Sequence, residues 1–201
     1  MAIYALADLH LSFGTDKPMD IFGDAWGDYT KKIKENWQSI ISDDDLVIIP
    51  GDVSWATYIE DAYEDFKFIN RLNGKKVILK GNHDYWWTTL SKMNKFLNEN
   101  KFNSITILNN NAIEFENAAI CGTRGWFFEE ERSGQHDEKV FKRELMRLEA
   151  SLKSAGDLQK LVFLHYPPRY KGYTCDEILA LFDKYEVRQC YYGHLHGASH
   201  G

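Results

Sequence analysis

The chain has 201 residues, of which 44% are hydrophobic and 14% aromatic, with a formal net charge of −6. This acidic balance argues against a broad surface for long nucleic acids, which needs clustered Lys and Arg. No apolar stretch approaches the roughly 20 residues that a membrane-spanning helix needs. We therefore expect one soluble domain over residues 1–201 with a sizeable core.

The cysteines and the N-terminus indicate an intracellular protein. Cys121, Cys175 and Cys190 are far apart and form no C-x-x-C pair, so a disulfide framework or a zinc–thiolate site is a poor interpretation. The first residues contain no basic leader and reach a charge at Asp8, so we expect no signal peptide. Reduced thiols in a cytoplasmic protein are the expectation.

The first half of the chain predicts alternating strands and helices. Strands are expected at residues 3–6, 46–49 and 77–79, and helices over residues 29–41, from Thr57 onward and near residues 89–97. The first helix carries Trp37 and Ile40 on an apolar face at helical spacing. The second opens with Thr57-x-x-Glu60, a capping-box pattern. Such alternation implies right-handed crossovers and a largely parallel sheet.

The second half begins differently. Strands are expected at residues 104–108, 112–115, 118–121, 161–164 and 189–192. The first three are short and joined by Asn-rich turns, which predicts a meander. A charged helix over residues 137–153 would turn Phe141 and Leu148 inward, and Thr174-x-x-Glu177 would cap one more helix.

Short polar blocks follow five of the expected strands. They are Asp8-Leu9-His10, Gly51-Asp52, Gly81-Asn82-His83-Asp84, His165 and Gly193-His194-Leu195-His196, and only His136 and His200 of the seven histidines lie outside them. Parallel strands would bring these blocks to one rim of a sheet, where α/β proteins bind ligands. Divalent metals prefer this mixture of carboxylate, amide oxygen and imidazole. The pattern therefore predicts a metal-dependent hydrolase.

Each block also has an ordinary structural explanation when it is taken alone. Asp8 and Asp52 would serve as helix caps or turn residues, and His165 as a hydrogen-bonded histidine before Tyr166. The glycines would serve turn geometry. Five such coincidences after five strands would have to occur together, so the metal site is the favoured interpretation.

In this order, the blocks resemble the five motifs of the calcineurin-like metallophosphoesterase family: D-x-H, G-D, G-N-H-[DE], a lone H and G-H-x-H. The resemblance spans residues 8–196. It implies an α/β fold, a four-layer α/β/β/α sandwich with two central mixed sheets flanked by helices. Family members usually continue with strands that complete the second sheet, whereas this chain stops at Gly201, so either those C-terminal strands are missing from the sequence or the second sheet is closed differently.

The resemblance also implies a dinuclear centre. One ion would be held by Asp8, His10, Asp52 and His196, and the other by Asp52, Asn82, His165 and His194. Asp52 would bridge them, because a carboxylate has two oxygens for two cations. Such a pair activates a water as hydroxide for attack and neutralises charge on the phosphoryl oxygens. Mn, Fe, Zn and Co all suit these ligands.

Three further roles concern the substrate. His83 resembles the family's proton donor to the leaving alcohol, and Asp84 would hydrogen-bond its ring. Asn82 and Arg124 are candidates for binding the phosphate, since a guanidinium can grip two phosphate oxygens. A structural salt bridge is an equally good interpretation of Arg124.

Large aromatic residues gather beside the motifs. They are Trp55, Tyr85, Trp86, Trp87, Trp126, Phe127 and Tyr166. Some would line the cleft and stack on an aromatic leaving group. Core packing is the favoured interpretation for most of them.

The expected function is hydrolysis of a phosphate mono- or diester, with a small molecule, a nucleotide or a phosphoprotein as substrate. One alternative is a scaffold of the same fold that binds metal without catalysis. It is disfavoured because the proposed ligands and the proton donor are all present. Another is a mononuclear zinc hydrolase, which needs fewer ligands than this chain offers.

Overall fold

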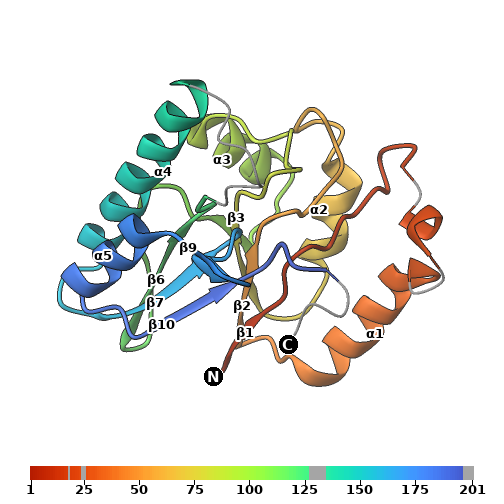
Figure 1. The fold of residues 1–201 in the computed structure, drawn as a ribbon. Helices are drawn as coiled ribbons and strands as arrows, with labels where there is room; N and C mark the ends of the chain where they lie inside the picture. Colours follow the sequence, from red (N-terminus) through yellow and green to blue (C-terminus); the bar gives the residue numbers. More distant parts are fainter. Residues whose placement is uncertain (18, 24–25, 127–134, 197–201) are drawn as a thin grey trace. The chain divides into compact units, whose positions relative to one another are not determined.

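The computed structural model describes residues 1–17, 19–23, 26–126 and 135–196. The chain forms two compact units, drawn in sequence colours in Figure 1. Unit 1 comprises Met1–Ile78 and Asn82–Ile107, and unit 2 comprises Leu79–Gly81 and Leu108–Gly201. The expectation of one domain stays a prediction. Helices combined with several sheets confirm the predicted mixed α/β class.

The first sheet has the strand order β1-β2-β3-β4. Its strands are β1 (Ile3–Ala5), β2 (Leu46–Pro50), β3 (Lys75–Leu79) and β4 (Ile105–Ile107). β1 pairs with β2 in parallel, and β3 pairs with β4 in parallel. The helical elements of unit 1 are η1 (Met19–Phe22), α1 (Tyr29–Ile40), α2 (Tyr63–Asn70) and α3 (Leu90–Glu99).

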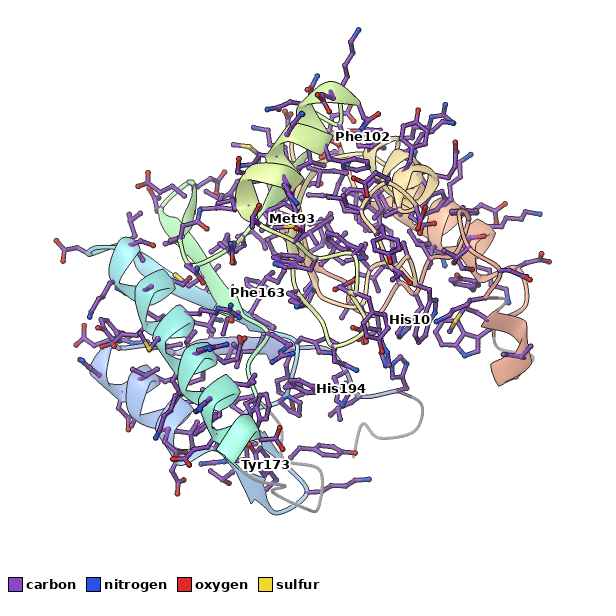
Figure 2. The ribbon with its side chains drawn as sticks, turned by 90° about the horizontal axis from the view of Figure 1, so that it is seen from above. His10, Met93, Phe102, Phe163, Tyr173 and His194 are labelled. Carbon is purple, nitrogen blue, oxygen red and sulfur yellow. The ribbon has the colours of Figure 1, made fainter. Side chains whose placement is uncertain are left out.

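The core of unit 1 joins this sheet to its helices. Every residue of β2 is buried, as expected for a strand covered on both faces. Trp37 of α1, Phe66 of α2 and Met93 of α3 belong to one hydrophobic cluster with the strand residues. Figure 2 labels Met93 and Phe102 in this core. The packed helices hold the strand ends, and therefore the loops that follow them, in fixed positions.

The second sheet has the strand order β10-β7-β6-β5. Its strands are β5 (Ile113–Phe115), β6 (Ala118–Thr123), β7 (Gln159–Leu164) and β10 (Gln189–Tyr192). β7 pairs in parallel with both β6 and β10, and β5 pairs antiparallel with β6. Unit 2 also contains α4 (Gln135–Ser154), α5 (Asp176–Lys184) and a small hairpin of β8 (Arg169–Tyr170) and β9 (Tyr173–Thr174).

The core of unit 2 lies between its sheet and its two helices. Phe141, Leu148 and Leu152 of α4 are buried against it, as the helical spacing predicted. The three cysteines are free thiols, with Cys121 and Cys175 buried. Among the described helices, none combines the length and the apolar character that crossing a membrane requires.

The predicted meander is wrong. Of the three strands predicted to form it, β5 and β6 form an antiparallel hairpin, whereas β4 pairs in parallel with β3 and belongs to the first sheet. The reason is that α3 acts as a crossover between β3 and β4. A short apolar strand has the same sequence pattern in either sheet, so the pattern alone could not assign it.

Two predicted helix starts are also wrong. Residues 57–62 are turns and bends, and α2 begins at Tyr63 with Ala62 as its N-cap. Thr174 ends β9, and Cys175 precedes α5 without a side-chain cap. By contrast, the Thr89 side chain does cap α3 by accepting a hydrogen bond from Lys92 N at 3.4 Å.

The predicted apolar face of α1 is confirmed in part. Trp37 is 3% exposed and lies in the core. Ile40, at the last position of the helix, is 62% exposed.

Lys76 of β3 has an unusual environment for a lysine. It is fully buried, and its Nζ donates hydrogen bonds to the carbonyl oxygens of Leu72 at 2.6 Å and Gly74 at 2.8 Å. Burial lowers its pKa to about 8, from 10.5. Since the folded state releases the proton first, folding becomes more favourable as the pH rises from about 8 to 10.5.

The Lys76→Met variant should lack this pH dependence. We expect the free energy of unfolding of the wild-type protein, relative to that of the variant, to increase by up to roughly 3 kcal/mol over this pH range. Urea denaturation at pH 8, 9 and 10 measures the difference. Lys75→Met, at the exposed neighbouring position, is the control. A difference that does not change with pH would show that Lys76 stays charged in the fold.

Candidate metal centre

Three of the predicted motifs lie together in unit 1, on the loops that follow β1, β2 and β3. Backbone hydrogen bonds join the first two loops, from Asp8 N to Gly51 O at 3.1 Å and from His10 N to Asp52 O at 2.9 Å. His83 N donates to Asp52 Oδ1 at 2.8 Å and so joins the third loop. Hydrogen bonds therefore join the loops that carry the first three motifs.

The backbone of these loops is strained. Asp8, His10 and Asp52 have φ values of 58°, 44° and 53°, in the left-handed region. In unit 2, His194 has a φ of 69°. A residue with a side chain in this region costs about 1–3 kcal/mol, and such residues cluster at functional sites. The strain falls on four of the predicted metal ligands.

Asp52 is a buried acid, with 1% exposure. Its Oδ2 lies 3.8 Å from Nε2 of His10, which is itself buried. Asp8 and His10 each offer a ligand atom, and the two atoms lie within 4.8 Å of one another. Burial raises the pKa of Asp52 to about 8, with further increases from the negative charges of Asp84 and Asp8. Such a cluster of carboxylates suits a cation.

Asp84 is hydrogen-bonded to the backbone of the loop that contains Gly51 and Asp52. Its carboxylate is 1% exposed and accepts hydrogen bonds from the backbone N–H of Asp52 at 2.9 Å and Val53 at 2.8 Å. It also accepts from Trp86 Nε1 at 3.0 Å. Asp84 therefore holds the loop that carries Asp52. Its predicted bond to the ring of His83 stays a prediction.

Aromatic rings surround His83. Its ring centroid lies 5.7 Å from that of His10, 4.6 Å from that of Trp55 and 6.2 Å from that of Tyr85. Trp55 is stacked on His10 at 5.0 Å. Trp86 is a core residue, as favoured for most of the aromatic group, whereas Tyr85 is 57% exposed. Phe127 lies outside the described residues.

Unit 2 carries the remaining motifs at the ends of β7 and β10. His165 is fully buried, and its ring centroid lies 5.1 Å from that of His194, with a ring nitrogen of each within 4.8 Å of the other. Gly193 N donates to Leu164 O at 3.3 Å, which continues the pairing of the two strands. His196 follows on the same loop as His194 and is exposed. Figure 2 labels His194.

Arg124 also lies in unit 2. It forms a structural salt bridge, which was one of the two roles predicted for it. Its Nη2 lies 3.7 Å from Oε1 of Glu144, a carboxylate that also accepts from Thr123 Oγ1 at 2.6 Å. The carbonyl oxygen of Arg124 accepts hydrogen bonds from the backbone N–H of His165 at 3.1 Å and Tyr166 at 2.9 Å. The guanidinium lies 5.5 Å from the ring of Trp126. A phosphate-binding role for Arg124 stays a prediction.

Glu144 is a residue that the motif search missed. It is 3% exposed on α4, three residues after Phe141 and four before Leu148, on the buried face of that helix. A charge within an apolar stripe was the available sign, because a buried acid needs a partner.

The comparisons with known proteins agree with this geometry. The fold and its clusters of Asp and His are those of metal-dependent phosphoesterases. The chain matches the family model for calcineurin-like phosphoesterases over residues 1–198 and belongs to that family. A search of curated proteins gave no match.

Two solved structures show the same fold. One is a protein of unknown function from Aquifex aeolicus, with a TM-score of 0.50 and 17% identity, covering 96% of this chain and 89% of that chain. The other is the phosphopantetheinyl hydrolase of Mycobacterium tuberculosis, with a TM-score of 0.52 and 14% identity, covering 96% and 82%. At these identities the likeness concerns the fold alone.

Proposed function

We propose that this protein is a dinuclear metal-dependent phosphoesterase that hydrolyses phosphate mono- or diesters, with His83 as the general acid. The observation that carries the proposal is the gathering of Asp8, His10 and Asp52 on strained, hydrogen-bonded loops. Burial and the neighbouring acids raise the pKa of Asp52 to about 8. Bound cations would relieve this repulsion, activate a water and neutralise charge on the phosphoryl oxygens.

The order of the family motifs assigns the ligands. In the proposal, Asp8, His10, Asp52 and His196 hold one ion, and Asp52, Asn82, His165 and His194 hold the other. Within each unit, the candidate ligands that belong to that unit lie near one another, which supports the assignment. The mixed N and O ligands suit Mn, Fe, Zn or Co.

The other residues act on the substrate. His83 would transfer a proton from its imidazole to the leaving oxygen of the ester. Asn82 and Arg124 would hold the phosphoryl oxygens, since a guanidinium binds two of them at once. Asp84 would keep Asp52 in place through the backbone bonds of its loop.

Reconstitution of the metal-free protein with Mn, Fe, Zn or Co tests the proposal. We expect about two ions per chain by elemental analysis, and metal-restored cleavage of an aryl phosphomonoester or an aryl phosphodiester. The phosphopantetheinyl hydrolase of similar fold makes a phosphopantetheine ester a useful third substrate. One ion with activity would favour the mononuclear alternative. Bound metal with no cleavage of any of the three would favour a non-catalytic scaffold.

A further inference from the structure

The loops that carry His10 and Asp52 both connect to one buried residue of α2. Asp65 is fully buried, and its Oδ1 accepts a hydrogen bond from the backbone N–H of Phe13 at 2.8 Å. Its Oδ2 accepts a short hydrogen bond from the hydroxyl of Ser54, which is 1% exposed. Phe13 lies three residues after His10, and Ser54 lies two residues after Asp52. A single carboxylate therefore links both loops.

The two loops also pair with each other beyond the proposed ligands. Leu11 N donates to Val53 O at 2.9 Å, and Trp55 N donates to Leu11 O at 2.9 Å. Ser54 Oγ in turn accepts from Ala56 N at 3.1 Å. These bonds tie the Asp52 loop to the segment that holds His10, so both loops are held to each other as well as to Asp65.

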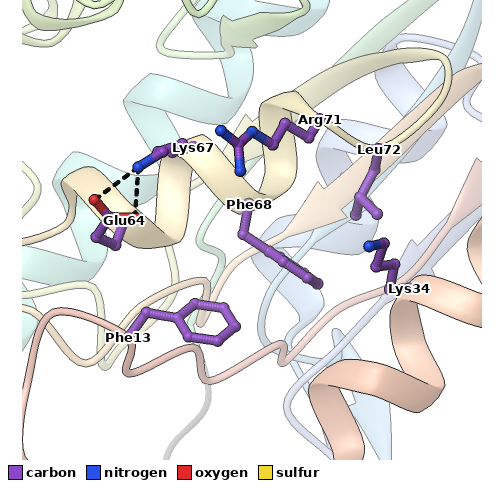
Figure 3. Close-up of a pocket in the computed structure, with 7 residues that line it drawn as sticks. All are labelled: Phe13, Lys34, Glu64, Lys67, Phe68, Arg71 and Leu72. Atoms are coloured by element: carbon purple, nitrogen blue, oxygen red, sulfur yellow. Dashed lines mark hydrogen bonds and ion pairs between the residues drawn. The ribbon is translucent and has the colours of Figure 1, made fainter.

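Phe13 is held on α2 a second time, through its side chain. Its ring centroid lies 5.1 Å from that of Phe68, and Figure 3 shows the two rings in a surface pocket of about 360 Å³. Phe68 lies three residues after Asp65, on the same helix. The backbone and the ring of Phe13 therefore dock on α2 at two separate points.

We propose that Asp65 is a positioning residue of the metal centre, one that sets the positions of the His10 and Asp52 loops through its bonds to Phe13 and Ser54. This inference rests on the proposed function. Asp65 touches no reacting atom; it acts through Ser54 and through the backbone of Phe13. Residues that hydrogen-bond metal ligands directly usually change metal affinity or activity 10–100-fold when they are altered, and this range sets the scale expected for Asp65, which acts through the ligand loops.

Asp65→Asn and Ser54→Ala test the link from its two ends. An Asn at position 65 still accepts from Phe13 N, but its amide nitrogen can only donate to Ser54 Oγ, which already accepts from Ala56 N, and the Ser54 hydroxyl loses its acceptor on Asp65. Ser54→Ala removes the same bond with a smaller change, and it carries the test if Asp65→Asn does not fold. Glu64→Gln is the matched control, because Glu64 neighbours Asp65 on α2 and pairs with Lys67 at the surface.

The main readout is Mn²⁺ affinity, measured by titration calorimetry on metal-free protein, with thermal melting recorded separately. We expect each variant to bind Mn²⁺ roughly 10–100-fold more weakly than the wild-type protein. The double variant should be no weaker than the weaker single variant, because both changes act on the hydrogen bond from Ser54 Oγ to residue 65. Glu64→Gln should bind like the wild-type protein.

Folded variants that bind Mn²⁺ as tightly as the wild-type protein would overturn the role of Asp65 alone. An equal loss in Glu64→Gln would also overturn it, because the effect would then be a general one of α2. A wild-type protein that binds no Mn²⁺, Fe, Zn or Co would overturn both this inference and the proposed function. The two failures are therefore distinguishable.

Discussion

Replacement of Asp52 by Asn should abolish metal-dependent hydrolysis and raise the melting temperature of the metal-free protein at pH 8. The carboxylate is needed to bridge the two proposed ions, which a neutral amide cannot do. Without metal, that same carboxylate is buried beside the negative charges of Asp84 and Asp8. Removing its charge relieves the repulsion, and even ~1 kcal/mol would raise the melting temperature by roughly 2–4 °C.

The pKa of Asp52 also predicts how the stability difference between the two proteins changes with pH. The pKa of Asp52 is about 8 in the folded protein and about 3.8 in a free carboxyl, so the folded state holds the proton longer. The wild-type protein therefore loses stability as the pH rises from about 4 to 8, and the advantage of Asp52→Asn grows over that range. Thermal melting of both metal-free proteins at pH 5 and 8 measures it.

Asp45→Asn provides a control of opposite sign. Asp45 accepts hydrogen bonds from the backbone and side chain of Ser42 and from Ala2 N, and these bonds lower its pKa. Its charge stabilises the fold, so the Asn variant should melt at a lower temperature at pH 8 and keep its metal. A metal-free Asp52→Asn protein that also melts lower would contradict the account of Asp52.

Replacement of His83 by Ala should slow the hydrolysis of esters with poor leaving groups by roughly 10²–10⁴-fold, because the leaving oxygen loses its acid catalyst. An aryl ester with a good leaving group needs less protonation and should lose much less. Parallel assays on an alkyl and a nitrophenyl phosphate measure the difference. Metal content should remain at the wild-type level, since His83 is not among the proposed ligands.

Tyr85→Phe is a suitable control for that experiment. Tyr85 is exposed and its ring lies 6.2 Å from that of His83, so the variant perturbs the surroundings of the imidazole without removing it. We expect its turnover to stay near that of the wild-type protein. Undiminished turnover of the alkyl ester by His83→Ala would exclude His83 as the general acid. A loss of bound metal in this variant would indicate that His83 is a metal ligand instead.

The strands and the motifs that follow them could be predicted from the sequence because their physical causes are local. β2 is a run of five buried residues that ends at the Gly51-Asp52 turn, and β7 ends immediately before His165. Any one of these polar residues has an ordinary structural explanation, but five blocks of Asp, Asn and His after five strands are hard to explain without a shared site. The family match over residues 1–198 agrees with that reasoning.

The remaining features depend on contacts that are distant in sequence. The sheet that β4 joins is decided by its partner strand, and the start of α2 is decided by the packing of residues 57–62. Asp65 bonds to Phe13, 52 residues earlier, and has no motif of its own. Glu144 was detectable only as a charge on a buried helical face. Contacts of this kind can be identified only from the three-dimensional structure.

The left-handed backbone at Asp8, His10 and Asp52 has a consequence for protein engineering. Glycine adopts this conformation without strain, and asparagine tolerates it better than most residues. A directed-evolution campaign that rewarded heat resistance alone would therefore favour those two residues at these positions. The selected variants would be more stable but would lack the proposed metal ligands and their activity. Each round of selection therefore has to include a screen for catalysis.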